Sequence, residues 1–159
     1  VMDLNLPGIG GLAAIRRIVA RDAAARILVF SIHDEPVYVT RAMEAGALGY
    51  VSKSGAPDML VEAVISVAAG RPFLEPAMTR KLSGQAAPPA AAPLNLLTPR
   101  EFDVLCRLAQ GHSTRETAEA LKLSAKTVAN YVTTIKEKLD ARTTGELVRM
   151  AYQAGLVTR

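Results

Sequence analysis

Residues that build redox and metal sites are scarce in this sequence. It has one cysteine, Cys106, so an internal disulfide is excluded. The apolar neighbours of Cys106 favour a buried side chain over a nucleophile. The two histidines, His33 and His112, lie far apart and have no second cysteine or HxxxH spacing to complete a set of ligands. The sequence therefore disfavours a metal centre built on histidine or cysteine.

Long apolar runs are missing too, although half of the 159 residues are hydrophobic. No run approaches the roughly 18 to 20 residues that cross a bilayer, and no signal peptide is evident. We therefore expect a protein of the cytoplasm that has no membrane partner. The sequence begins at Val1, inside an apparent strand and without an initiator methionine, so we expect it to be part of a longer protein.

Charged residues are absent from one internal stretch, residues 83–96, which read SGQAAPPAAAPLNL. Three prolines and a block of alanines predict a tether that forms no core. This linker separates residues 1–82, with nine Lys and Arg against eight Asp and Glu, from residues 97–159, with ten against seven. Most of the net charge of +4 therefore lies in the C-terminal domain.

Short apolar runs alternate with helical patterns in the N-terminal domain, residues 1–82. The runs VMDL, ILVFS and LGYVS predict buried strands at 1–4, 27–31 and 48–52. Apolar residues at helical spacing predict helices at 12–21, 37–46 and 57–70, with Gly70 as the C-cap of the last. Alternation of strand and helix predicts an α/β fold with a parallel sheet.

The C-terminal domain, residues 97–159, has helical patterns only. Its opening LTPRE reads as a capping box, with Thr98 as N-cap, Pro99 in the first turn and Glu101 three residues after the cap. Three further amphipathic segments follow, joined by connections of a few residues. The sequence thus predicts a small all-α domain of four helices.

Three residues of complementary chemistry stand at the ends of the predicted strands: Asp3, Ser31 and Lys53. In open parallel sheets, binding and chemistry collect at the carboxyl ends of the strands. A carboxylate can attack a phosphoryl group, a lysine can pair with the resulting phosphate, and a serine hydroxyl can bind one of its oxygens. The alternative is purely structural: a salt bridge between Lys53 and Asp3, with Ser31 capping a turn.

A second alternative is a dinucleotide loop, because residues 8–13 fit the pattern G-x-G-x-x-A. Asp34 lies 23 residues after Gly11, near the place of a ribose-binding acid. Against this hypothesis, Pro7 interrupts the junction from strand to glycine, and Asp3 would put negative charge beside a pyrophosphate. We therefore regard the glycines as a loop behind Asp3.

The motifs DLNLPGIGGL and AGALGYVSK resemble the phosphoacceptor loop and the last strand of two-component receiver domains. The resemblance implies a partial flavodoxin-like receiver in which Asp3 is phosphorylated by a sensor histidine kinase and Lys53 holds the phosphoryl group. Ser31 falls at the Ser/Thr switch position and Tyr50 at the aromatic switch position of that family. On activation Ser31 would move onto the phosphate while Tyr50 swings inward.

The same resemblance implies a Mg²⁺ site that includes Asp3 and the backbone carbonyl of Asn5. Receivers complete this site with an acidic pair at the end of their first strand. The first two strands and helices of a receiver are missing from this sequence, and the acidic pair is missing with them. This counts against Mg²⁺ binding and phosphorylation of the chain as written, since the metal neutralises the transferring phosphoryl group.

In the C-terminal domain, the helix predicted at 125–139 has two contrasting faces. Val128, Val132, Ile135 and Leu139 form one apolar stripe. The opposite face carries Lys126, Ala129, Asn130, Thr133 and Lys136. Such a face suits a helix that enters a major groove, where Asn130 can pair with adenine and Thr133 can contact a base edge. A merely solvated helix face is the alternative.

The run from LTPRE through LSAKTV to the KL at 138–139 resembles the LuxR-type DNA-binding domain over some fifty residues. The resemblance implies a scaffold helix at 114–122 and a recognition helix at 125–139, with Thr127 and Ser113 as phosphate donors. Two positions depart from the commonest TVKNHV form, because Ala129 replaces a lysine and Tyr131 a histidine. Joined to a receiver, this domain implies a response regulator of the NarL/FixJ class.

The sequence therefore predicts a DNA-binding transcriptional regulator and not an enzyme. The resemblance implies that the unphosphorylated receiver covers the recognition helix, and that phosphorylation frees a homodimer for double-stranded DNA. Dimerisation would use a final helix at about 143–154, with Thr143, Leu147 and Met150 near the interface. In an alternative hypothesis, the incomplete receiver serves only for dimerisation or docking, and DNA binding is independent of phosphate.

Overall fold

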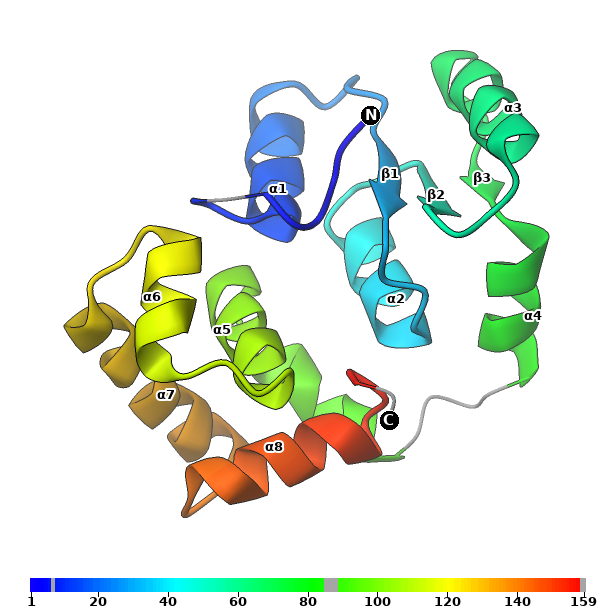
Figure 1. Ribbon diagram of the computed structural model, residues 1–159. Helices are drawn as coiled ribbons and strands as arrows, with labels where there is room; N and C mark the ends of the chain where they lie inside the picture. The colour runs from blue at the N-terminus through cyan, green and yellow to red at the C-terminus, as the bar shows by residue number, and fades with distance from the viewer. Residues whose placement is uncertain (7, 85–88, 158–159) are drawn as a thin grey trace. The chain divides into compact units, whose positions relative to one another are not determined.

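The computed structural model describes residues 1–6, 8–84 and 89–157. The chain divides into two compact units, and apart from the loop at 7–10 the division falls between residues 86 and 87 (Figure 1). The first unit is an α/β structure with a parallel sheet, and the second is helical, as predicted. Among the described residues, no helix is long and apolar enough to cross a membrane.

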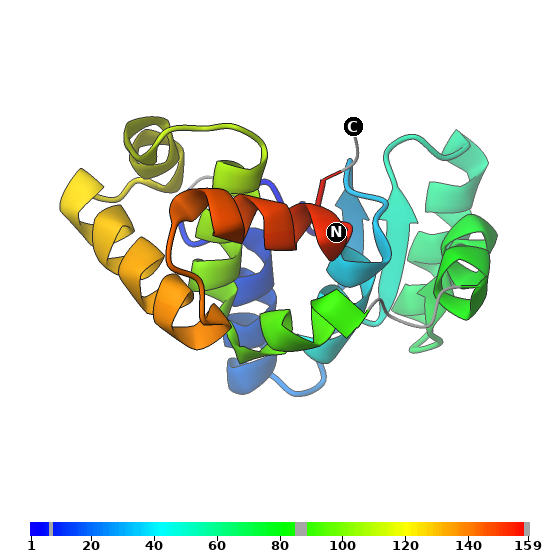
Figure 2. The same cartoon turned by 90° about the horizontal axis from the view of Figure 1, so that it is seen from below.

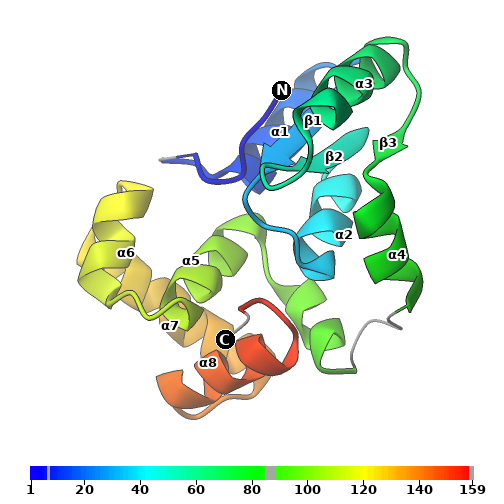
Figure 3. The same cartoon turned by 45° about the vertical axis from the view of Figure 1, so that its right-hand side comes forward.

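The first unit contains a three-stranded parallel sheet in the order β1-β2-β3. Its strands are β1 (Leu28–Ser31), β2 (Gly49–Ser52) and β3 (Phe73–Leu74). Helices α1 (Gly11–Arg21), α2 (Pro36–Glu44) and α3 (Pro57–Ala68) connect or follow the strands. Figure 3 shows α2 and α3 on either side of the strands. The helices predicted from apolar spacing are confirmed within a few residues.

The core of this sheet follows the alternation of side chains along its strands. Leu28 and Val51 pack against Ala63 and Val67 of α3, and Phe30 joins the same cluster. Val29 and Tyr50 are register partners and point to the opposite face, because successive strand residues alternate. Residues 28, 29, 50 and 51 are buried, and Phe30 is partly buried. Both faces of the sheet are therefore covered, as continuous apolar strands require.

The predicted strand at 1–4 is present as a single parallel bridge between Met2 and Val29. The Met2 amide donates to the Leu28 carbonyl and the Phe30 amide donates to the Met2 carbonyl, each over 2.8 Å. The start of the chain thus lies beside β1, on the side of β1 that faces away from β2. This pairing places Asp3 at the same edge of the sheet as the ends of β1 and β2.

The segment after α3 contains two elements that the sequence did not reveal, β3 and α4 (Pro76–Gly84). β3 pairs with β2, and the Glu75 carboxylate accepts a hydrogen bond of 3.0 Å from the Ser52 amide. On α4, the Lys81 Nζ lies 2.5 Å from the Asp34 carboxylate in the loop after β1. This segment is therefore part of the first unit and not a loose connection.

The described residues of the second unit form a 3₁₀ helix and four α-helices. They are η1 (Pro89–Leu96), α5 (Pro99–Ala109), α6 (Thr114–Leu121), α7 (Ala125–Leu139) and α8 (Thr144–Gln153). α7 packs against α5 and α6, and α8 lies across α5 (Figure 2). The side chains of Phe102, Leu105, Ile135 and Leu147 are fully buried in this unit. The four predicted helices are confirmed.

Part of the predicted linker at 83–96 belongs to these folded units instead. α4 continues to Gly84, and residues 89–96 form η1, which packs on α7 and α8. Leu94 is only 1% exposed. Burial of this apolar side chain favours packing of the Pro/Ala-rich stretch against its unit. Residues 85–88 of this stretch lie outside the described residues.

Side-chain caps fix where the helices of the second unit begin. Thr98 and Glu101 form the predicted capping box at the start of α5, and Ser113 with Glu116 forms another before α6. Ser124 caps α7, accepting a hydrogen bond of 3.0 Å from the Thr127 amide. The turn between α6 and α7 begins at Lys122, whose left-handed backbone (φ 53°) ends α6. α6, this turn and α7 form a helix-turn-helix.

Candidate functional site

Asp3 and Lys53 meet at the carboxyl ends of the strands. The Lys53 Nζ lies 2.5 Å from the Asp3 Oδ2, and the Asn5 amide donates a 3.0 Å hydrogen bond to the Asp3 Oδ1. Burial acts to raise the pKa of Asp3, but the hydrogen bonds from Lys53 and Asn5 outweigh it and hold the pKa below its ordinary value. Asp3 is therefore an ionised carboxylate near neutral pH, the form that a nucleophile requires.

Ser31 lies at the end of β1, between these two residues in the sheet order. Its carbonyl accepts a 2.8 Å hydrogen bond from the Lys53 amide, which fixes the backbone after β2. Its buried hydroxyl accepts a 3.3 Å hydrogen bond from the His33 amide and so closes a turn. The arrangement contains the ion pair and serine turn of the structural alternative, and the same three groups remain suitable for holding a phosphoryl group.

Tyr50 is fully buried on the face of the sheet opposite to α3. Its hydroxyl donates a 2.7 Å hydrogen bond to the carbonyl oxygen of His33, and burial raises the pKa of this phenol. A neutral hydroxyl remains a donor at every physiological pH, so the ring is held inward. The inward position that the resemblance associates with activation is already adopted here.

His33 is a member of this site that sequence reasoning missed. Its Nε2 lies 3.3 Å from the Asn5 Oδ1, and its ring stacks on Tyr38 with the centroids 4.1 Å apart. The residue therefore joins the loop after Asp3 to the loop after β1. Its position two residues after Ser31 was the available indication, but an isolated histidine carries little information by itself.

The residues present do not fit a magnesium site. Among the described residues, no group of three or more His, Cys, Asp and Glu is placed to hold a metal ion. Asp3 supplies the carboxylate of the predicted site, and its two oxygens accept hydrogen bonds from the Asn5 backbone amide and from Lys53. Mg²⁺ needs several oxygen ligands in octahedral geometry, and one carboxylate with the Asn5 carbonyl falls short of that set.

The glycine loop after Asp3 has a structural explanation. α1 begins at Gly11, whose amide donates a 3.1 Å hydrogen bond to the Leu4 carbonyl. A Cβ at Gly11 would lie 2.4 Å from the Leu4 Cα, so only glycine permits this close return of the chain. Asp34, the proposed ribose ligand, pairs with Lys81 instead. These contacts disfavour the dinucleotide hypothesis.

α7 presents the two faces that its sequence predicted. Val128, Ile135 and Leu139 are buried in the second unit, while Val132 is partly exposed at its margin. The exposed face includes four of the predicted DNA-binding residues, and Lys136 is half-buried beside them. These four are Lys126, Ala129, Asn130 and Thr133.

The N-terminal end of α7 has the electrostatics of an anion-binding surface. Its first turn contains no acidic residue, and the exposed Lys126 lies in it. The helix dipole adds partial positive charge there, which favours phosphate groups. The Thr127 hydroxyl lies 2.8 Å from the Ser124 hydroxyl, and Ser113 is exposed at the start of α6. Lys126 and the hydroxyl groups of Ser124 and Thr127 thus lie at the start of α7, and the Ser113 hydroxyl lies at the start of α6.

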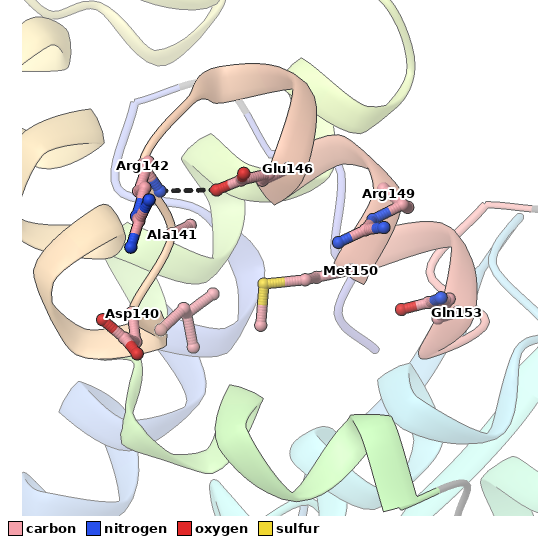
Figure 4. Close-up of a pocket in the computed structure, with 8 residues that line it drawn as sticks. Asp140, Ala141, Arg142, Glu146, Arg149, Met150 and Gln153 are labelled. Carbon is pink, nitrogen blue, oxygen red and sulfur yellow. Dashed lines mark hydrogen bonds between the residues drawn. The ribbon is translucent and has the colours of Figure 1, made fainter.

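A surface hollow of about 510 Å³ lies between the end of α7 and α8. Figure 4 shows Arg142, Arg149 and Met150 around it, with a hydrogen bond of 2.6 Å from the Arg142 amide to Glu146. Thr143 is the exposed N-cap of α8. Leu147, predicted to lie near a dimer interface, has a fully buried side chain, and its place near an interface stays a prediction.

A parallel sheet with a paired aspartate and lysine at its edge, followed by a helix-turn-helix, is the architecture of a two-component response regulator. Residues 1–65 match the family model of the response regulator receiver domain. Residues 95–151 match that of the bacterial regulatory proteins of the luxR family. Together these matches cover both units.

Whole-chain comparisons agree with the domain matches. The chain is 43% identical over 160 residues to the transcriptional activator protein ExaE of Pseudomonas putida, covering 99% of this chain and 75% of that protein. It is 44% identical to the crystal structure of a LuxR-family two-component response regulator from Aurantimonas sp. SI85-9A1, with a TM-score of 0.51 over 52% of this chain and 59% of that one. The structure of two RcsB dimers bound to two parallel DNAs gives a TM-score of 0.51 at 25% identity, covering 95% of this chain and 72% of that one.

The chain belongs to the response regulators of the NarL/FixJ class, with a receiver domain and a LuxR-type DNA-binding domain. The family explains why an α/β unit and a helix-turn-helix unit occur in one chain. It also points to two surfaces for function. One is the sheet edge that carries Asp3, and the other is the exposed face of α7.

Proposed function

We propose that this response regulator is phosphorylated on Asp3 by a sensor histidine kinase, and that phosphorylation gates dimerisation and DNA binding. The observation that carries the proposal is the 2.5 Å contact between the Lys53 Nζ and the Asp3 carboxylate. The contact places an ionised phosphoryl acceptor, Asp3, beside a cation, Lys53, that can pair with the oxygens of the transferred phosphoryl group. The regulator acts by binding, in the cytoplasm where its kinase would deliver the phosphoryl group, and not by turning over a substrate.

In the proposed transfer, one Asp3 oxygen forms a bond to phosphorus as the bond between phosphorus and the donor breaks. Lys53 then pairs with the added phosphoryl oxygens instead of the bare carboxylate. The Ser31 hydroxyl, now part of a turn with His33, becomes a donor to one of those oxygens. Since Ser31 and Tyr50 both contact His33, a change at Ser31 reaches the Tyr50 hydrogen bond through the same loop.

For the second unit, we propose that the exposed face of α7 enters the major groove of double-stranded DNA. Asn130 and Thr133 contact base edges, with Ala129 beside them, while Lys126 and Lys136 pair with phosphates. Thr127 and Ser113 supply hydroxyl groups to the backbone. The LuxR-type match and the relative whose structure is described as RcsB dimers bound to DNA support this assignment.

A second candidate function keeps DNA binding but removes the dependence on phosphate. The observation in its favour is the composition of the site, because no group of three or more His, Cys, Asp and Glu among the described residues is placed to hold a metal ion. In this case the receiver serves as a dimerisation or docking module. The residues proposed to contact DNA are the same in both candidates.

A gel shift with a double-stranded DNA probe, with and without the phosphoryl donor acetyl phosphate, separates the two candidates. Gating predicts tighter binding after treatment, together with an acyl phosphate on Asp3 in the mass spectrum of the protein. Equal binding in both states, without the modification, favours the phosphate-independent regulator. Absence of any DNA complex would contradict both candidates.

A further inference from the structure

Lys138, near the end of α7, is engaged inside its own unit. Its Nζ donates hydrogen bonds to both carboxylate oxygens of Glu101 on α5, over 2.9 Å and 2.7 Å. Glu101 is only 5% exposed, whereas the Lys138 side chain keeps 32% of its surface accessible. From sequence, Lys138 looks like one more lysine for the DNA backbone, but its charge is already neutralised by a buried partner.

Glu101 also belongs to the capping box at the start of α5. Its Oε2 accepts a 2.7 Å hydrogen bond from the Thr98 amide, and its own amide donates to the Thr98 hydroxyl over 3.3 Å. Burial acts to raise the pKa of Glu101, but Lys138 and Thr98 outweigh it and hold the pKa below its ordinary value. One carboxylate therefore joins the first turn of α5 to the last turn of α7.

The residues of α7 that are buried in its unit are apolar. Val128, Ile135 and Leu139 are buried apolar side chains, and apolar burial has no preferred direction. Charge-assisted hydrogen bonds are directional, and two of them to one carboxylate fix the position of the donor more tightly than one does. The Glu101–Lys138 contact is thus suited to setting the rotation and axial position of α7 relative to α5.

We propose that Lys138 and Glu101 are positioning residues for DNA binding, and that Lys138 is not a phosphate contact. The pair holds α7 so that Lys126, Asn130 and Thr133 are presented together to the groove. This inference rests on the proposed DNA-binding function of α7. It gives Lys138 a different role from Lys126, which is exposed in the first turn of the same helix.

A double-mutant cycle on the full chain tests the pair. Glu101→Gln, Lys138→Met and the double variant are titrated with a fluorescent mixed-sequence DNA duplex at fixed salt. Circular dichroism melting confirms that each variant is folded at the assay temperature. Because both changes break the same contact, each single variant binds roughly tenfold more weakly, and the double variant binds no more weakly than either single one. Lys138→Arg, which keeps the charge and the donors, retains most of the affinity.

Glu101→Gln is the most discriminating variant, because it removes a negative charge from a DNA-binding protein. Charge alone predicts tighter binding for this variant, whereas loss of positioning predicts weaker binding. Tighter or unchanged binding by folded Glu101→Gln, or additive effects in the cycle, would overturn the inference. Failure of the wild-type chain to bind the duplex at any salt concentration would instead overturn the proposed function, and with it the role given to the pair.

Discussion

The hydroxyl of Tyr50 donates a 2.7 Å hydrogen bond to the carbonyl oxygen of His33, and the tyrosine side chain is fully buried. This contact ties β2, which ends beside Lys53, to the loop that follows Ser31. The residues that surround Asp3 are therefore part of one connected structure.

Tyr50→Phe should destabilise the first unit by about 1 kcal/mol, because it leaves the His33 carbonyl without its buried donor while keeping the ring. Chemical denaturation followed by circular dichroism measures the effect. Tyr152→Phe is the matched control, since Tyr152 is exposed on α8. A Tyr50→Phe protein as stable as this control would show that the hydrogen bond contributes nothing to the fold.

Lys126→Ala should weaken binding to all DNA sequences alike and should flatten its salt dependence. Loss of one phosphate contact lowers the slope of log K against log salt by about 0.9. Arg17→Ala removes the same charge from an exposed position on α1 and should leave the slope unchanged. Titrations of two unrelated duplexes at several salt concentrations provide the measurement. An effect of Lys126→Ala that is confined to one base of one site would contradict a phosphate contact.

Leu147→Ala should destabilise the second unit by about 2 to 5 kcal/mol, because it leaves a cavity where a fully buried side chain was. Met150→Ala, on the hollow between α7 and α8, should cost less stability but weaken any dimer formed through α8. Thermal unfolding and analytical ultracentrifugation separate the two effects. A Leu147→Ala protein with normal stability but impaired dimerisation would instead show that Leu147 acts at an interface.

The pKa of Glu101 predicts how acid affects the second unit. Because its pKa in the folded chain lies below the ordinary value, the ionised carboxylate contributes stability at neutral pH. This contribution is complete above the pKa of the unfolded chain and is lost as the pH falls through the folded value. The difference in stability between wild type and Glu101→Gln should therefore shrink as the pH is lowered from 7 toward 3. A difference that stays constant over this range would rule out the carboxylate as its source.

The apolar stripe of α7 could be predicted from local spacing, and the bounds 125–139 followed from the resemblance to LuxR-type domains. The edge that carries Asp3, Ser31 and Lys53 followed from the general rule for parallel sheets. β3 could not be predicted, because two residues give no periodicity and its pairing depends on β2. Leu94 was missed for a similar reason, since the composition around it indicates a tether and only the folded helices provide its buried contact.

Side-chain partners were the least predictable part of the candidate site. Spacing placed Lys126 and Lys138 in the same helix, but it could not show that Lys138 pairs with a glutamate 37 residues earlier. His33 was likewise treated as an isolated histidine, because its contacts with Asn5 in another loop and with Tyr38 in α2 appear only in the folded chain. Such contacts depend on tertiary structure, which local sequence patterns do not contain.

We propose that a single carboxylate, Asp3, controls the affinity of α7 for DNA. The most direct test is the dissociation constant for a DNA duplex, measured for wild type and Asp3→Asn, each with and without acetyl phosphate. We expect acetyl phosphate to tighten binding by the wild-type chain and to have no effect on Asp3→Asn. The same response in both proteins, or none in the wild type, would contradict control by Asp3.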